Sequence, residues 1–564
     1  MAKPWEVHYS AEAKRFDPAL LTAKTIPELA RESVEKFGDR PALTTFLPTG
    51  AQITVTYRQL GEYSDHFAAY LRETLGLQRG DTVAIMAPNC IGFCVASLGI
   101  AKAGCIGTNV NPLYTAGELE HQLSDSGATA IVIIDLFADK LDAAIGNTEV
   151  KHVISLSVTD FFPPLKRALI GFVLKYVKKV VPTMKSPYTR FADAMAKGRL
   201  AAASVDVATY TRDLSPSDTA LYQYTSGTTG RSKGAELSHF GIRVNAEQGR
   251  LMTHEIMDDD GETILVVLPL YHITAFTLIF ISGLGTGGHG VLVPSPRPPS
   301  NLKKAFEDYR ITWFTGINTL YAALLTEPWF DRKLFEEIRF CGSGGAAQQT
   351  GVAQNWADRT GVEIHQGYGM TEISGVVTLN PHNANKLGSV GIPVPGAELR
   401  IVDDAGKDVA QGEAGEVIAR SPTLMKGYLN NPQATAEALK DGWYYSGDIG
   451  VMDTQGFVEI VDRKKDMILV SGFNVSPNEI EDVISTLAGV AQVGVIGIPD
   501  EKTAEAPAAF IVRSDDSLTE EVVISHCREN LTNYKTPRQV RFVDEVPVTL
   551  SGKVLRRQLR DEYL

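Results

Sequence analysis

Residues 224–234 read YTSGTTGRSKG, and the interpretation of the whole chain starts from this stretch. It is rich in glycine and hydroxyl side chains and carries two cations, Arg231 and Lys233. Glycines let backbone N–H groups converge on oxyanions, and hydroxyl groups add further donors, so the composition favours a phosphate ligand. A Walker loop needs lysine directly after its second glycine, whereas here Lys233 comes three residues after Gly230. The stretch therefore predicts a phosphate-binding loop that is not a Walker loop.

The position of this loop supports a binding role over a flexible surface loop. It follows the apolar segment TALYQY (residues 219–224), and we expect a helix to begin near Ser238. That places the loop at the carboxyl end of a strand, where α/β sheets bind their ligands. A second glycine pattern, Gly283, Gly285 and Gly288, fits GxGxxG, but the following HGVLVPSPRPP cannot start a helix. We interpret it as a turn between strands, which excludes a nicotinamide-dependent enzyme.

Composition limits the class of protein. The net charge of −13 argues against nucleic acid as the main partner, because phosphate backbones need a basic surface. The five cysteines form no CxxC pair, which suits buried, reduced thiols. No stretch has the length of a signal peptide's apolar core or of a membrane span. We expect a cytoplasmic protein.

The chain length of 564 residues predicts at least two domains. Apolar runs such as TVAIMAPN, TAIVIID and TILVVLPLY alternate with amphipathic segments, which is typical of an α/β protein with largely parallel sheets. Past Ser389, shorter turn-rich pieces indicate antiparallel strands in a small barrel or sheet. DRKK (residues 462–465) then precedes a compact tail with its own helix and strands. We predict a division into residues 1–462 and 463–564.

Residues 161–192 contain seven Lys or Arg and no acidic residue, against the acidic trend of the chain. Apolar side chains from Leu165 to Val180 recur at helical spacing, with lysines around the rest of the wheel. A basic amphipathic helix can lie on an anionic bilayer, so we predict a possible peripheral membrane contact through Leu165–Val181. The alternative is a helix docked on the core with a solvated basic face.

Four further stretches complete an ordered set with the opening loop: QGYGMTE (366–372), YSGDIG (445–450), DRKKDMILVSGFNVSP (462–477) and TLSGKVLR (549–556). This set resembles the acyl-adenylate-forming superfamily. The text around the motifs, including GTNVNPLYTAGELEHQLSDSGATAIVI and VLPLYHI, is similar to the bacterial long-chain fatty-acid–CoA ligases of β-oxidation within that superfamily. The resemblance covers nearly the whole chain. It implies a large N-terminal domain of two α/β subdomains plus a small β-barrel, with a mobile α+β C-terminal domain.

The resemblance also implies a reaction. A carboxylate attacks the α-phosphate of ATP to give an acyl-adenylate and diphosphate, and coenzyme A then displaces AMP to form a thioester. In this scheme Lys233 and the loop hold the β- and γ-phosphates, Tyr368 stacks on adenine, and Asp448 and Arg463 contact the ribose. Thr371 reaches the α-phosphate, and Lys553 bridges the carboxylate and α-phosphate oxygens. The Mg²⁺ ligands are Glu372, whose hard oxygens suit that cation, and Thr228.

The remaining implied nucleotide-binding residues are Thr225, Ser226, Gly227, Thr228, Thr229, Gly230, Gly344, Gly345, Ala346, Gln366, Gly367 and Gly369. Lys465 is implied as the hinge, and Gly472 approaches the coenzyme A channel after the small domain rotates. Two steps that need different groups at one centre give a physical reason for such a hinge. A homodimer is expected by analogy with relatives.

The acid to be activated is predicted from an absence of charge. Residues 267–276, VLPLYHITAF, contain no acidic side chain, so an amino-acid ammonium would lack a partner there. An acid with an apolar tail is favoured, with His272, Phe276, Gly316 and Thr319 as candidate pocket walls. Alternatives are an acyl-AMP ligase, a medium-chain or aryl acid ligase, a luciferase-like oxygenase and, in another class, a lipid-binding protein with a vestigial nucleotide fold.

Overall fold

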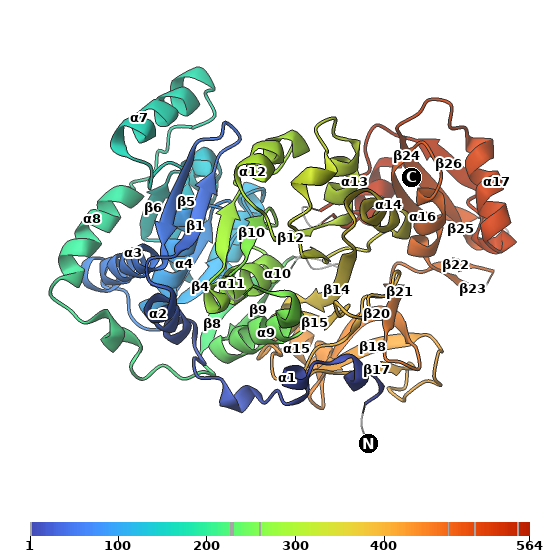
Figure 1. Cartoon of the computed structure of the whole chain (residues 1–564), viewed down its shortest axis with the longest axis horizontal. Coiled ribbons are helices and arrows are strands. Elements are labelled where there is room, and N and C mark those ends of the chain that lie inside the picture. Colours follow the sequence, from blue (N-terminus) through green and yellow to red (C-terminus); the bar gives the residue numbers. More distant parts are fainter. Residues whose placement is uncertain are drawn as a thin grey trace.

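The computed structural model describes residues 3–225, 231–258, 261–471, 473–500, 503–549 and 552–563. These residues form four β-sheets with helices packed around them, and Figure 1 shows the C-terminal part at one end of the elongated molecule. Two sheets are largely parallel, as the alternating pattern predicted, and the α/β class is confirmed. The antiparallel pairs of these two sheets lie toward their edges.

The first of these sheets has nine strands, in the order β16-β15-β14-β13-β12-β10-β11-β1-β2. Their bounds are Ile392–Pro393, Gly375–Leu379, Ile364–Met370, Phe340–Ser343, Trp313–Gly316, Thr263–Val266, His289–Leu292, Pro41–Phe46 and Gln52–Thr56. The second has seven strands, in the order β7-β6-β5-β3-β4-β8-β9. Their bounds are Thr189–Arg190, His152–Leu156, Ala128–Ile134, Thr82–Met86, Ile106–Asn109, Thr219–Thr225 and Lys233–Ser238.

One hydrophobic core joins the two large sheets, because helices between them are buried on many sides. Helix α4 (Ile91–Lys102) is apolar around nearly its whole circumference, as expected of a helix enclosed by other elements. The other helices of this part are α1 (Ala11–Lys14), α2 (Ile26–Phe37), α3 (Tyr57–Ala69), α5 (Ala116–Asp125), α6 (Ala138–Ala144), α7 (Pro164–Phe172), α8 (Phe191–Ala202), α9 (His239–Leu251), α10 (Ile273–Ala275), α11 (Ser282–Thr286), α12 (Lys303–Asp308), α13 (Asn318–Thr326) and α14 (Thr350–Thr360).

A third sheet follows, as the turn-rich sequence past Ser389 predicted. It is antiparallel and pairs in the order β17-β18-β20-β19, with β21 on β20. The bounds are Glu398–Val402, Gly415–Arg420, Trp443–Met452, Leu439–Lys440 and Val458–Arg463, and α15 spans Pro432–Ala438. Of the two arrangements left open by the sequence, the described pairings correspond to a sheet.

The C-terminal part has its own sheet and its own cores. The sheet runs β23-β22-β25-β24, with β26 on β25, and its strands are Phe473–Val475, Ile468–Val470, Ala504–Arg513, Val490–Asp500 and Gln539–Phe542. Its helices are α16 (Pro477–Ser485), α17 (Glu520–Asn530) and α18 (Arg556–Tyr563). The chain passes from the third sheet to this one between Arg463 and Ile468.

The structure adds to one local expectation and corrects another. As expected, the opening loop follows β8 and a helix, α9, begins at His239 with Ser238 as its N-cap, but a strand that was not predicted, β9, lies between them and pairs antiparallel with β8. The strand forms because residues 233–238 pair with β8. The GxGxxG stretch is not a turn between strands: Gly283 and Gly285 lie in α11, and Gly287, at φ +75°, ends that helix before β11. As expected, no helix follows it directly.

All five cysteines are free and buried. Burial raises the pKa of Cys90, Cys105 and Cys341 to about 12, so these thiols stay protonated. Among the described residues, no helix is long and apolar enough to cross a membrane.

Candidate active site

Strand β14 carries the QGYGMTE motif into the site and changes partner along its length. Its first half pairs in parallel with β13, through Gln366 and Ser343, and its second half pairs antiparallel with β15. A Cβ at Gly369 would lie 1.9 Å from the carbonyl oxygen of Gly375, so only glycine permits this close approach. The motif is therefore held on paired backbone rather than on a free loop.

Tyr368, on β14, bonds to the carboxylate of Asp448, on β20. The Tyr368 hydroxyl donates to Asp448 Oδ2 at 2.6 Å, and Arg463 Nε donates to Asp448 Oδ1 at 3.1 Å. Burial and the adjacent carboxylate hold the pKa of Tyr368 well above its usual range, so the phenol keeps its proton and donates. A carboxylate has about four acceptor positions, so Asp448 can accept two further donors, such as the hydroxyls of a ribose.

Glu372, one turn beyond β14 in η12 (Thr371–Ile373), lies in a second cluster. Its side chain is buried, and Oε1 accepts a hydrogen bond from the Tyr428 hydroxyl at 2.6 Å. Burial and the charge of Glu372 raise the pKa of Tyr428. Lys233 Nζ lies 5.1 Å from the centre of the Tyr428 ring, a cation–π distance. Tyr428 thus links a phosphate-loop cation to the expected metal ligand.

The described residues contain no group of three or more His, Cys, Asp or Glu side chains that could hold a metal ion. Mg²⁺ is commonly bound by one or two carboxylates and completed by substrate phosphates and water. A single buried glutamate, linked through Tyr428 to Lys233, fits that mode of binding, so Glu372 is compatible with Mg²⁺.

Lys553 comes from the C-terminal part and lies within electrostatic reach of Asp448 and Arg463. Burial, together with the positive charge of Arg463, lowers the pKa of Lys553 to about 8 against the opposing charge of Asp448. The neighbouring Gly552, at φ +80°, packs against the large domain: a Cβ there would lie 2.9 Å from Ile317 Cδ1. The arrangement brings together motifs that are about a hundred residues apart in sequence.

The other predicted residues are placed as follows. Thr225 ends β8 and pairs with Lys233, and Lys465 follows β21, where burial lowers its pKa. Six predicted residues, Ser226, Gly227, Thr228, Thr229, Gly230 and Gly472, lie outside the described residues. Tyr428 was missed, although it contacts Glu372 directly, because its segment MKGYLNN resembles no motif used in the sequence analysis.

A largely apolar cavity adjoins this site. At one end its wall includes Gly344, Gly345, Gly367, Tyr368 and Gly369 from the predicted nucleotide residues. The rest of the wall comprises Gly249, Arg250, Thr253, Met257, Ile264, Thr274, Leu278, Ile279, Ser282, Gly283, Thr286, Trp313, Thr315, Phe340, Gly342, Ser343, His365, Gly375, Val376 and Leu379. An apolar chamber that ends at a charged, hydrogen-bonding site suits a molecule with an apolar tail and a polar head.

The four pocket residues predicted from sequence, His272, Phe276, Gly316 and Thr319, are not in this described wall, which uses their neighbours instead. Thr274, Leu278 and Ser282, spaced four residues apart, line the cavity from α10, from the π-helix η9 (Phe276–Ile281) and from α11. His272 is buried, which lowers its pKa to about 4, so the imidazole is neutral. Thr319 lies toward the Lys553 loop, with its Oγ1 3.5 Å from the Cβ position of Gly552.

The model of the AMP-binding enzyme family matches residues 30–429, and that of the AMP-binding enzyme C-terminal domain matches residues 479–553. The chain belongs to the AMP-binding enzyme family. This AMP-binding enzyme is 43% identical to a long-chain-fatty-acid–CoA ligase of Yersinia pestis, over all of the chain and 98% of the relative. It is 42% identical to a ligase of the same name from Haemophilus influenzae, over 100% and 99% of the two chains.

Solved structures show the same fold. The crystal structure of the anthranilate CoA ligase AuaEII in complex with anthranoyl-AMP matches with a TM-score of 0.85 at 26% identity, covering 97% of this enzyme and 99% of that chain. The family membership thus agrees with the resemblance inferred from the five motifs.

Proposed function

We propose that this enzyme activates long-chain fatty acids to acyl-CoA through an acyl-adenylate, with ATP and coenzyme A as substrates. The observation that carries the proposal is the apolar cavity that ends at Tyr368, whose hydroxyl bonds to Asp448, the expected ribose acceptor. The names of the full-length relatives support a long-chain fatty acid as the substrate. We also propose a role in β-oxidation, which consumes acyl-CoA thioesters.

In the first half-reaction the chain's own groups position and neutralise charge. Asp448 and Arg463 hold the ribose, and Tyr368 provides both a flat face for adenine and a donor that orients Asp448. Lys553 places its ammonium between the fatty-acid carboxylate and the α-phosphate, where negative charge develops. Lys233 and the loop after Thr225 restrain the diphosphate that leaves. Mg²⁺, held by Glu372 and Thr228, would supply further charge neutralisation at the phosphates.

The second half-reaction requires Lys553 to withdraw so that the thiol of coenzyme A can reach the acyl carbon. We propose that residues 1–462 and 463–564 move as two bodies about Lys465, which lies between the last strand of one sheet and the first strand of the next. The motion would bring the segment around Gly472 toward the acyl-adenylate. Separate cores in the two parts support such a rigid-body motion.

The test is thioester formation from ATP, coenzyme A and saturated acids of increasing length, with benzoate as an aryl competitor. We expect the highest kcat/KM for long-chain acids. Adenylate formation without a coenzyme A thioester would instead identify an acyl-AMP ligase, and a preference for octanoate or benzoate would identify a medium-chain or aryl acid ligase. An absence of ATP–diphosphate exchange with every acid would contradict the proposal altogether.

We also propose that α7 and η6 (Val173–Val177) contact an anionic membrane. Neither element has a buried residue, and Figure 1 shows α7 at the periphery of the molecule. Leu165, Leu169, Phe172, Tyr176 and Val177 are between 56% and 84% exposed. Lys166, Arg167, Lys175, Lys178 and Lys179 lie in the same segment and are also exposed. The apolar side chains can insert at the boundary of the acyl chains, and the cations can bind lipid phosphates. This combination favours contact with an anionic bilayer.

The membrane test is cosedimentation with vesicles. We expect binding to phosphatidylglycerol vesicles that high salt weakens, and little binding to phosphatidylcholine vesicles. Phe172→Glu should lose binding, whereas Leu200→Glu, a change at a still more exposed apolar side chain on α8, should retain it. Equal binding of the two variants would contradict the assignment. The homodimer stays a prediction by analogy, which sedimentation equilibrium can test.

A further inference from the structure

Part of the cavity wall is formed at the C-terminal end of α9 and by the segment after it. Asn245 bonds to the backbone of Val376, donating to its oxygen at 2.6 Å and accepting from its nitrogen at 2.9 Å. Val376 follows Gly375, which packs against the QGYGMTE motif. Gly249, Arg250 and Thr253 lie one to two turns beyond Asn245, at about 1.5 Å per residue along the helix. Met257 follows and lines the same part of the wall.

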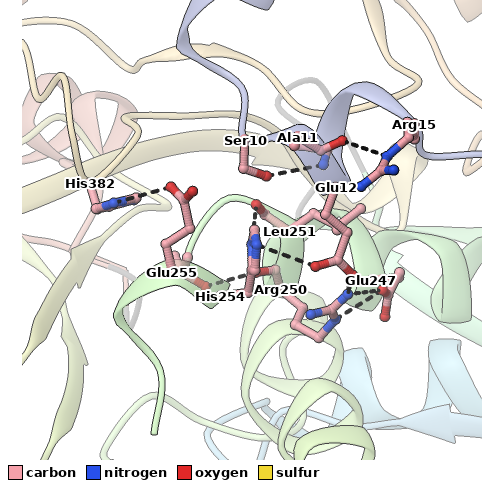
Figure 2. A network of polar contacts seen from close by, with 12 residues as sticks. Ser10, Ala11, Glu12, Arg15, Glu247, Arg250, Leu251, His254, Glu255 and His382 are labelled. Atoms are coloured by element: carbon pink, nitrogen blue, oxygen red, sulfur yellow. Dashed lines mark hydrogen bonds and ion pairs between the residues drawn. The ribbon is translucent and has the colours of Figure 1, made fainter.

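Arg250 is held there by two carboxylates, as Figure 2 shows. Its guanidinium donates to Glu247 Oε1 at 2.9 and 2.7 Å and also to Glu12 Oε1, on α1. His254 Nε2 lies 3.3 Å from the other oxygen of Glu12. Because its charged head is bonded to these two carboxylates, the part of Arg250 that suits an apolar wall is its methylene stem. The side chain is 24% exposed, so this part of the cavity wall lies close to the surface.

Helix α1 is a short segment attached to the surface at this point. The hydroxyl of Ser10 caps it by accepting from Ala13 N at 3.1 Å, and Tyr9 donates to the carbonyl of Pro393 at 2.5 Å. The Glu12 side chain is half-exposed, and ion pairs of such exposure contribute little individually. The contact between α1 and Arg250 is therefore one that can open without unfolding the core.

We propose that the Glu12–Arg250 contact closes the acyl cavity at this part of its wall and thereby sets the longest fatty acid that the enzyme accepts. This inference rests on the proposed function, since it assigns the cavity to the acyl tail. A fatty-acid tail that fits inside the cavity contacts the methylene stem of Arg250 together with Thr253 and Met257. A longer chain must displace Arg250 from Glu12 to extend past α9. Glu12 acts as a positioning residue, because it holds Arg250 and does not itself line the described cavity.

The test compares two ion pairs on the same surface. Glu12→Ala removes the contact between α1 and Arg250 and leaves the Glu247 contact in place, whereas Glu255→Ala removes the contact between Glu255 and His382, at 3.4 Å. Glu255 and His382 are similarly exposed but do not line the described cavity, so this variant is the matched control. Thioester formation is measured from decanoate to docosanoate, with kcat and KM determined separately.

We expect Glu12→Ala to raise the kcat/KM ratio of docosanoate to decanoate about tenfold or more, because one methylene in an apolar pocket changes this parameter by about ten- to 200-fold. The change should appear in KM for the long acid, with decanoate and the unfolding temperature unchanged. Glu255→Ala should keep the wild-type profile. Met257→Trp should act in the opposite direction, excluding long acids while retaining decanoate.

Three outcomes distinguish a failure of the proposed function from a failure of the assignment of the Glu12–Arg250 contact. If the wild-type enzyme forms no thioester with any acid, the proposed function fails. If it is active and the profiles of Glu12→Ala and Glu255→Ala coincide, the assignment of the contact is refuted. A uniform loss of activity with every acid in Glu12→Ala also refutes it, because this result indicates a purely structural contact.

Discussion

In the proposed reaction Lys553 must carry a positive charge during adenylation, yet its surroundings disfavour that charge in the absence of substrate. Burial and the nearby Arg463 together lower its pKa from 10.5 to about 8. This shift corresponds to about 3 kcal/mol of disfavoured protonation, at about 1.4 kcal/mol for each pKa unit. The phosphates of ATP and the fatty-acid carboxylate oppose the shift when they bind, so the charged lysine is restored in the substrate complex.

The sign of the resulting pH dependence follows directly. A lysine is charged below its pKa, so the free enzyme loses the competent form as pH rises through about 8. The kcat/KM of the first half-reaction, which reports the free enzyme, should therefore fall about tenfold per pH unit above that value. The kcat should hold to a higher pH, because bound substrates raise the pKa of Lys553. ATP–diphosphate exchange at saturating and limiting ATP measures both.

Two variants make this prediction refutable. Lys553→Arg keeps its charge throughout the range, so any remaining exchange activity should lose the decline near pH 8. Lys553→Ala should abolish exchange while largely sparing thioester formation from supplied acyl-adenylate, which does not use this lysine. A decline that persists in Lys553→Arg, or a wild-type profile that stays flat to pH 10, would refute the electrostatic argument. Equal loss of both half-reactions in Lys553→Ala would contradict the two-position account.

Three further predictions concern single contacts. Tyr368→Phe keeps the ring but removes the hydrogen bond to Asp448, and a hydrogen bond to a charged group is worth about 1.5–3 kcal/mol. The KM for ATP should therefore rise at least about tenfold, with little change in unfolding temperature. An unchanged KM would exclude the role given to the hydroxyl. Gly369→Ala should lower both stability and exchange activity, because the added Cβ would collide with the backbone of Gly375. The control is Gly117→Ala on α5, where the added Cβ has no neighbour. Thermal unfolding should show that this control is neutral or stabilising by about 0.5–1 kcal/mol. Arg556→Met leaves the buried carboxylate of Glu481, 2.9 Å away, without its positive partner. Denaturant unfolding should show a loss of about 3–5 kcal/mol in the stability of the C-terminal domain. Adding Glu481→Gln in a double variant should recover part of that loss.

The sequence predicted best those features that short-range chemistry imposes. The alternation of apolar runs predicted the parallel sheets, and the five motifs together indicated the family. Glycine requirements such as that of Gly369 are local, because they arise from one close backbone approach. Constraints of this kind can be predicted because they determine the residue types within a short segment of the sequence.

Features that depend on distant contacts were not readable. Tyr428 bonds to Glu372 across 56 residues of sequence, and nothing in its own segment signals that partner. The π-helix at residues 276–281 was not predicted, because it has the same apolar composition as an α-helix. The hairpin of β8 and β9 formed where a loop leading into a helix was expected, since the pairing of two strands decides that outcome.

The partner exchange of β14 has a consequence for how this region can vary. Successive residues of a strand point to opposite faces, and residues 364–370 are fixed in register by β13 at one end and β15 at the other. The pairing with β15 shifts register between Tyr368 and Gly369, so the face on which Tyr368 lies is set from the β13 end. Deleting or inserting one residue between Gln366 and Tyr368 would turn the Tyr368 side chain away from Asp448. Substitutions can therefore alter the chemistry of this segment, but a change of length before Tyr368 would misplace that side chain. Natural variation in length should be confined to the loops that flank the two sheets.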